Sequence, residues 1–245
     1  MNPLAGGNSN QVFKQGQTVV RQTGAWSPFV HALLGYLTAH GFTESPVLLE
    51  ATPTHERLSF IAGEVGNDPL KPHMQSDGMV IEAAQLLRRF HDLTADFVIP
   101  PDAQFLLPTQ SPHEVICHND FAPYNLVFQG EHIVGMIDFD AAAPGNRLWD
   151  IAYAVYRFAP LVTDAHCLAM GWQHVPDRQA RLMLFCDAYG LENRVPLIET
   201  VIRRIEALVR YMQATASNLE HIPIYLADLE YIRTHQATLM VNKTL

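Results

Sequence analysis

The sequence predicts an α+β protein of two lobes, with a short β-rich lobe first and a longer, mainly helical lobe after it. Brief β-favouring runs precede a polar segment rich in proline and glycine, residues 66–78, and long helical patterns follow that segment. A chain of 245 residues, 48% of them apolar, can bury one large core or two smaller ones that share a cleft. We therefore expect a first lobe of residues 1–64 and a second lobe of residues 65–245.

The first lobe is expected to contain short strands and one helix. Gly16 lies between two β-favouring runs and permits a tight hairpin connection. Ser27 and Pro28 form a typical helix start, a cap followed by a first-turn proline, and an apolar stripe continues until shortly before Gly41. The β-favouring runs are residues 12–13, 18–21, 47–49 and 58–61.

The second lobe is expected to be built from amphipathic helices. Apolar side chains recur at helical spacing in residues 80–90, and a broader apolar stripe in residues 198–212 must be buried against a neighbour. Acidic side chains on the later helical segments either line a substrate pocket or simply face solvent. These acidic residues are Glu192, Glu199, Glu206, Asp228 and Glu230.

Composition argues against several classes of protein. The formal charge of −9, from 25 acidic and 16 basic side chains, is opposite to that of a surface that binds nucleic acid. Cys117, Cys167 and Cys186 are widely spaced in apolar stretches, so we expect reduced thiols rather than disulfides or a zinc site. The N-terminus lacks a signal-like pattern, and no apolar stretch reaches membrane-spanning length. We expect a cytoplasmic protein with no nucleic-acid or membrane partner.

Residues 115–140 carry the polar groups that point to chemistry. Two strand-like apolar runs bracket a polar loop, in which Asn125 follows Asp120 after four residues, and Asp138 ends the next apolar run. We expect these three side chains to converge. Aspartate and asparagine oxygens suit Mg²⁺, and a second aspartate can accept the proton of an attacking hydroxyl, as phosphoryl transfer requires. Taken singly, Asp120 and Asn125 also fit a turn-capping role.

The order of these residues resembles that of a known family. His118 begins a His-x-Asp-x-x-x-x-Asn pattern typical of the catalytic loop of the kinase fold, and Asp138 stands where the metal loop has an aspartate. Over most of its length the chain resembles the aminoglycoside phosphotransferase and choline kinase-like branch of the protein-kinase-like superfamily. The resemblance implies a two-lobed protein-kinase-like fold, Asp120 as the catalytic residue, and Asn125 with Asp138 as ligands of Mg²⁺. It also implies that Asp150 braces the catalytic loop.

The same resemblance assigns nucleotide-binding roles in the first lobe. Gly6, Gly7 and Asn8 are candidates for the loop that covers the ATP phosphates, because small residues let backbone amides approach closely. A glycine pair near an N-terminus is equally typical of a flexible chain start. Phe60 and Ile61 resemble the strand and hinge that lie beside the adenine.

Arg21 stands where that family has a lysine that holds the phosphates, with a helix carboxylate as its partner. Arginine is planar and always charged, and it is not a conservative substitute for lysine. The helix expected at residues 28–40 contains no acidic residue, so the partner is either missing or replaced by a residue such as His31. This difference bears on activity more than on fold.

The leading hypothesis is an ATP-dependent small-molecule kinase that phosphorylates a hydroxyl group of an aminoglycoside-, choline- or homoserine-like acceptor. The alternative is a non-catalytic ligand-binding or immunity protein on the same scaffold, because residues 148–153 loosely resemble those of trifolitoxin immunity proteins. A third possibility is a nucleotide hydrolase that has lost its acceptor site. The presence of Asp120, Asn125 and Asp138 together favours the enzyme.

Overall fold

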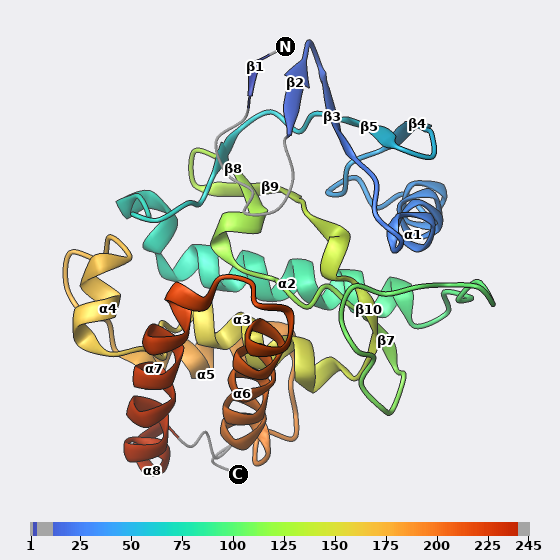
Figure 1. The fold of residues 1–245 in the computed structure, drawn as a ribbon. Coiled ribbons are helices and arrows are strands. Elements are labelled where there is room, and N and C mark those ends of the chain that lie inside the picture. Colours follow the sequence, from blue (N-terminus) through green and yellow to red (C-terminus); the bar gives the residue numbers. More distant parts are fainter. Residues whose placement is uncertain (1, 4–11, 240–245) are drawn as a thin grey trace.

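The order of strands and helices along the chain gives a β-rich first lobe and a mainly helical second lobe, and the predicted α+β class is confirmed (Figure 1). The computed structural model describes residues 2–3 and 12–239. The first lobe is built on a five-stranded antiparallel sheet in the order β1-β2-β3-β5-β4. Its strands are β1 (Asn2–Pro3), β2 (Phe13–Gln15), β3 (Thr18–Gln22), β4 (Leu48–Ala51) and β5 (His55–Ser59).

Two local features of this sheet position later parts of the site. Gly16 has φ 61° in the turn between β2 and β3, a left-handed conformation that glycine tolerates, so the predicted hairpin is confirmed. Strands β3 and β5 pair in a register that sets Arg21 opposite Glu56. The two long side chains therefore lie side by side on the same face of the sheet.

Helix α1 (Ser27–Ala39) lies beside the sheet and follows the predicted apolar stripe. Its inward residues are buried and include Phe29, Leu33 and Leu37. The predicted first-turn proline is confirmed, but the cap assignment was wrong. Trp26 occupies the cap position, and the hydroxyl of Ser27 instead accepts a hydrogen bond from the amide of Gly24 at 2.9 Å.

Two smaller antiparallel sheets carry the polar loop. One has the order β6-β8-β9 and the other pairs β10 with β7. Their strands are β6 (Glu64–Val65), β7 (Val115–Cys117), β8 (Leu126–Gln129), β9 (His132–Met136) and β10 (Ala143–Gly145). Strand β6 pairs Val65 with Val127, so the expected lobe boundary between residues 64 and 65 falls inside a strand that is bonded to β8.

The helices of the second lobe pack around a core that includes Phe90, Phe121, Tyr156 and Phe185. Helix α2 crosses the middle of the molecule beneath β8 and β9 (Figure 1). The apolar stripes predicted at residues 80–90 and 198–212 are buried, which confirms both helices. The helices are α2 (Asp77–Thr94), α3 (Arg147–Phe158), α4 (Asp164–Ala169), α5 (Arg178–Tyr189), α6 (Leu197–Thr215), α7 (Ile222–Thr234) and α8 (Gln236–Leu239), with 3₁₀ turns η1 (Pro72–Gln75), η2 (Pro123–Asn125), η3 (Phe139–Ala141) and η4 (Leu219–His221).

The three cysteines, Cys117, Cys167 and Cys186, are free and buried, as expected. Burial raises the pKa of the Cys186 thiol to about 12 and that of Cys117 well above its ordinary value. The thiols therefore stay protonated near neutral pH. Among residues 2–3 and 12–239, no helix is both long enough and apolar enough to cross a membrane.

Candidate active site

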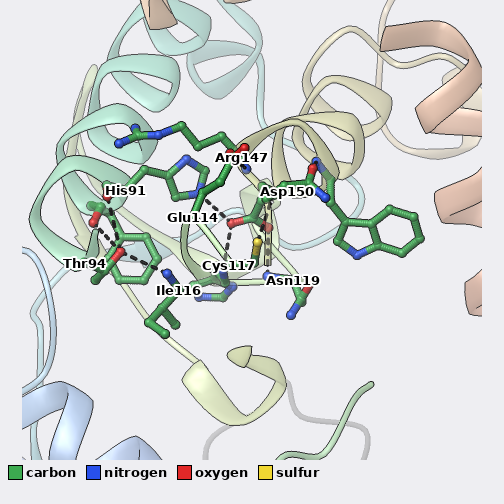
Figure 2. Close-up of polar contacts among 12 residues, drawn as sticks. His91, Thr94, Glu114, Ile116, Cys117, Asn119, Arg147 and Asp150 are labelled. Carbon is green, nitrogen blue, oxygen red and sulfur yellow. Dashed lines mark hydrogen bonds and ion pairs between the residues drawn. The ribbon is translucent and has the colours of Figure 1, made fainter. Parts of the chain in front are cut away.

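The loop after β7, called the catalytic loop for its predicted role, is anchored by a buried carboxylate. Asp150 lies in the first turn of α3, and its two oxygens accept hydrogen bonds from the backbone amides of His118 and Asn119, at 2.7 and 2.8 Å (Figure 2). Asn146 caps the helix by accepting a bond from the amide of Trp149 at 2.9 Å, which fixes the orientation of that first turn. The bracing role implied for Asp150 agrees with this geometry.

A histidine from α2 completes the anchor. His91 Nε2 lies 3.0 Å from Asp150 Oδ2, and His91 Nδ1 lies 2.8 Å from the hydroxyl of Tyr189. Burial would raise the pKa of Asp150, but the contacts with His91 and with the amide of His118 outweigh it and lower that pKa. The anchor is therefore a stable anion inside the core.

The loop backbone takes a strained turn at Asn119, where φ is 65°. That left-handed conformation is uncommon for residues other than glycine and persists where the surroundings hold it. The guanidinium of Arg204 donates to the carbonyl of Asn119 at 2.5 Å, and the Asn119 side chain donates to the carbonyl of Ala141 at 3.0 Å. Asp120 follows directly after this turn.

The carboxylate of Asp120 is held between two donors. Its Oδ1 accepts a hydrogen bond from the hydroxyl of Tyr124 at 2.6 Å, and its Oδ2 accepts one from the side-chain Nδ2 of Asn125 at 2.8 Å. Burial raises the pKa of Asp120, and the hydrogen bonds from Tyr124 and Asn125 oppose that shift only in part. A carboxylate more basic than usual suits a proton acceptor. Tyr124 was not expected at the site.

Asn125 and Asp138 are brought together by the backbone. The amide of Ile137 donates to the carbonyl of Asn125 at 2.9 Å, so Asp138 follows directly beside the loop. Because the Asn125 side-chain amide nitrogen donates to Asp120, its Oδ1 faces away and accepts from no donor in the described part of the chain. Asp138 has φ 63° and a half-exposed carboxylate.

These two side chains offer the kind of oxygen donor that Mg²⁺ prefers. Mg²⁺ is commonly held by one or two protein ligands while phosphates and water complete its shell. Residues 2–3 and 12–239 contain no group of three or more His, Cys, Asp and Glu arranged to hold a metal by themselves. Asn125 and Asp138 supply two oxygen ligands, which is fewer than a closed structural metal site has.

Arg21 on β3 contacts carboxylates of both lobes. Its Nε donates to Glu56, its Nη1 lies 3.3 Å from Asp138 Oδ1, and its Nη2 donates to Asp140 at 2.6 Å. Burial would lower the pKa of Arg21, but Asp140, Glu56 and Asp138 outweigh it and raise that pKa further. The guanidinium is therefore a permanent cation placed against Asp138, one of the two candidate metal ligands.

Glu56 is a residue at the site that the sequence analysis did not name. Helix α1 supplies no carboxylate to Arg21, as expected, and the residue that replaces it is Glu56 rather than His31. Glu56 on β5 is 2% exposed and contacts the Arg21 guanidinium through one oxygen, while His31 from α1 contacts its other oxygen. No local sequence pattern signals this contact, which arises because β3 and β5 set residues 21 and 56 opposite each other.

The remaining candidates for nucleotide binding lie in two places. Phe60 and Ile61 are half-buried and connect β5 to β6, with the amine of Lys14 3.5 Å from the Phe60 ring centroid. The Ile61 side chain packs against Gly135 of β9, where a Cβ would come within 2.8 Å of it. Gly6, Gly7 and Asn8 lie outside the described residues.

Comparison of the sequence with known proteins gives a direct assignment. Residues 102–184 match the phosphotransferase enzyme family (APH). A trifolitoxin immunity protein from Rhizobium leguminosarum bv. trifolii is 33% identical over 199 residues, which cover 78% of this chain and 74% of that protein. The chain belongs to the phosphotransferase enzyme family. The matched segment of this family contains Asp120, Asn125, Asp138 and Asp150.

Solved structures show the same fold at low sequence identity. A choline/ethanolamine kinase family protein from Mesorhizobium loti superposes with a TM-score of 0.62 at 16% identity, covering 99% of this chain and 88% of that chain. Amicoumacin kinase hAmiN, in complex with AMP-PNP, Ca²⁺ and Ami, superposes with a TM-score of 0.66 at 14% identity, covering 96% and 86%. The predicted kinase-like two-lobed fold is confirmed.

Proposed function

We propose that this protein transfers the terminal phosphoryl group of ATP to a hydroxyl group of a small molecule. The observation that carries the proposal is Asp120, a carboxylate of raised pKa held between Tyr124 and Asn125, with the oxygen donors of Asn125 and Asp138 next to it. A proton acceptor beside a site for a phosphate-bound cation is the arrangement that phosphoryl transfer needs. Membership of the phosphotransferase family supports the reaction class.

The acceptor hydroxyl is expected to approach Asp120. As its oxygen bonds to the γ-phosphorus, the bond from that phosphorus to the β–γ bridging oxygen breaks, ADP leaves, and the hydroxyl proton moves to Asp120. Mg²⁺ held by Asn125 and Asp138 would neutralise charge on the phosphate oxygens. The hydrogen bond from the Asn125 side chain to Asp120 Oδ2 would keep the carboxylate oriented during transfer.

The nucleotide is proposed to lie between lobes that divide at residues 64 and 65. Arg21 would turn from the carboxylates of Asp138 and Asp140 toward the phosphates, and Glu56 would keep its guanidinium in place. Phe60 and Ile61 would contact the adenine, and Gly6, Gly7 and Asn8 would cover the phosphates. A kinase needs ATP, which is available in the cytoplasm, so we propose a cytoplasmic location.

A transfer assay tests the proposal. Purified protein is incubated with γ-labelled ATP and Mg²⁺, alone and with each acceptor of a panel that includes aminoglycosides, choline and homoserine, and labelled products and ADP are measured. We expect acceptor-dependent labelling that Asp138→Ala abolishes and Asp102→Ala, an exposed aspartate outside the site, retains. ADP release that no acceptor stimulates would instead indicate a nucleotide hydrolase.

A second candidate is a ligand-binding or immunity protein without transfer activity. Two observations favour it: the relative that is 33% identical is a trifolitoxin immunity protein, and the Arg21 guanidinium rests on Asp138, one of the two candidate metal ligands. In that case ATP binding would not depend on Mg²⁺, and labelled product would be absent with every acceptor. The raised pKa of Asp120 would then have no chemical role, and we therefore favour the kinase over the binding protein.

A further inference from the structure

A chain of tyrosines begins at the oxygen of Asp120 that faces away from Asn125. The Tyr124 hydroxyl lies 2.6 Å from Asp120 Oδ1 and 2.6 Å from the hydroxyl of Tyr153 on α3, and Tyr225 on α7 lies near Tyr153. Burial raises the pKa of Tyr124 and Tyr153 well above the ordinary value, so both remain neutral donors. We name Tyr124, Tyr153 and Tyr225 the tyrosine cluster.

The position of the cluster defines the acceptor side of the site. Asp120 Oδ2 faces Asn125, which is the side of the proposed cation and phosphates. Its Oδ1 is the other available proton acceptor, and the group now bonded to it is a hydroxyl. An acceptor alcohol that gives its proton to Asp120 must therefore enter on the side of the tyrosine cluster.

Two buried arginines lie against this cluster. Arg157 is 7% exposed, and its guanidinium carbon lies 5.1 Å from the ring centroid of Tyr124. Arg204 is 4% exposed, and its guanidinium carbon lies 4.8 Å from the ring centroid of Tyr153. Arginine does not lose its proton in proteins, so two cations flank the acceptor side.

Both arginines have unused hydrogen-bonding capacity. The buried Nε atoms of Arg157 and Arg204 have no partner among residues 2–3 and 12–239. Arg204 donates to the carbonyl of Asn119, whereas Arg157 has only Asp68, at 3.4 Å, as a carboxylate partner. Leaving a buried guanidinium donor unpaired costs free energy, which an incoming anion would remove.

Nearby carboxylates do not cancel this positive charge. Asp68 is 43% exposed, so solvent screens its long contact with Arg157. Asp228 is fully buried, but it already accepts bonds from Tyr156 and the amide of Thr163 and contacts His166. Asp120 is the proposed acceptor of the hydroxyl proton. The acidic pocket that a cationic acceptor would need is therefore absent from the described residues around the cluster.

We propose that the acceptor is an alcohol that also carries an anionic group, a carboxylate or a phosphate, and that Arg157 binds this group. The inference rests on the proposed function and narrows its acceptor class away from aminoglycosides and choline. The acceptor hydroxyl would take the place of the Tyr124 hydroxyl on Asp120 Oδ1, with the anion beside the Arg157 guanidinium. Arg157 is then the residue that determines acceptor specificity.

Matched probes test the charge preference. Glycerol 3-phosphate and glycerol form the phosphate pair, 4-hydroxybutyrate and 1,4-butanediol form the carboxylate pair, and choline is the cationic probe. Binding is measured by calorimetry with and without AMP-PNP and Mg²⁺, and transfer is measured as labelled product from ATP. We expect at least one anionic probe to bind about ten- to one-hundredfold more tightly than its neutral partner, as one charge-assisted hydrogen bond allows. The arm that shows the preference identifies carboxylate or phosphate.

Variants connect that preference to one residue. Arg157→Gln should raise the Kd and KM of the anionic probe about tenfold or more, leave the Kd of the ATP analogue unchanged, and lower kcat less than KM rises. Arg157→Lys should recover part of the affinity, because it keeps the charge. Arg194→Gln is the control: Arg194 is 5% exposed, but its Nε and Nη2 bond to Leu191 and Asp187.

The outcomes separate this inference from the proposed function. Equal or tighter binding of the neutral or cationic probes, or anion binding that Arg157→Gln leaves intact in a folded protein, would overturn the anionic acceptor while Mg-ATP binding still supports a kinase. Absence of binding by both anionic probes would overturn it as well. Absence of nucleotide binding, with anion binding still dependent on Arg157, would overturn the kinase but keep the anion site.

Discussion

The catalytic loop and the surroundings of Arg21 hold charged groups in different ways. The loop is fixed inside the second lobe, where the buried carboxylate of Asp150 takes two backbone amides and the side chain of His91. Arg21 instead joins Glu56 of the first lobe to Asp138 and Asp140 of the second. The loop geometry is therefore built into one lobe, whereas the Arg21 contacts depend on how the lobes meet.

The largest expected effect is on the loop side of this comparison. Asp120→Asn removes the proton acceptor but keeps the size of the side chain, so kcat should fall about 10²- to 10⁴-fold, the usual contribution of a general base. The Kd for Mg-ATP should stay within about twofold, because Asp120 is not expected to hold the nucleotide. Steady-state ADP release and calorimetry measure the two quantities. An equal loss of both would move Asp120 to a binding role.

The anchor of the loop is expected to control stability. Asp150→Asn breaks a buried charged contact and should lower the free energy of unfolding by about 3 kcal/mol, measured by urea titration. Asp92→Asn, which alters an exposed pair with Arg88, should cost less than about 1 kcal/mol. An equally small effect of both would show that the loop is held by other contacts.

The same anchor predicts a pH dependence. The folded-state pKa of Asp150 is lowered, so its stabilisation is fully present above the unfolded pKa of about 4 and is lost as the pH falls through the lower folded value. Wild-type protein should therefore lose more stability than Asp150→Asn when the pH falls below about 4. Parallel losses in the two proteins would contradict the lowered pKa.

The Arg21 side should show a smaller effect on catalysis, through nucleotide binding. Glu56→Gln removes the partner that holds Arg21 in the first lobe, and the guanidinium should then stay on Asp138 and Asp140. We expect the Kd for Mg-ATP to rise about tenfold, the size of one charged hydrogen bond. Because Glu56 is buried beside Arg21, the free energy of unfolding should also fall. Glu50→Gln on the neighbouring strand is exposed and should have no effect. A fall in kcat without a change in Kd would place Glu56 elsewhere in the cycle.

The smallest effect is expected from Tyr124. Its hydrogen bond lowers the pKa of Asp120, so Tyr124→Phe should raise that pKa and shift the acidic limb of the kcat profile to higher pH. At a pH well above this limb, kcat should fall by less than about tenfold. Tyr36→Phe, whose hydroxyl bonds to the carbonyl of Leu93, serves as the control. An acidic limb that stays in place would separate Tyr124 from the titration of Asp120.

The features that could be predicted from the sequence are those set by short-range patterns of residues. The interval from Asp120 to Asn125 and the strand before Asp138 are short-range patterns, and the apolar stripes of α2 and α6 repeat at helical spacing. These patterns were sufficient for the fold class and for the contact of Asn125 with Asp120. The assigned roles of these residues remain predictions.

Long-range pairing was not predictable in the same way. Glu56 reaches Arg21 only because β3 and β5 pair in one particular register, and nothing within a few residues of Arg21 specifies that register. Arg157 and Arg204 come from α3 and α6, and only tertiary packing brings both against the tyrosine cluster. The carboxylate partner of Arg21 comes from strand β5 and not from helix α1.

Calorimetric titration with ATP, with and without Mg²⁺, tests the central claim that Asn125 and Asp138 receive a nucleotide-bound cation beside Asp120. Wild-type protein should bind ATP more tightly when Mg²⁺ is present, and Asp138→Ala should lose that difference while Asp120→Asn retains it. Binding of equal strength with and without Mg²⁺ in the wild type, or an undiminished Mg²⁺ effect in Asp138→Ala, would contradict the account.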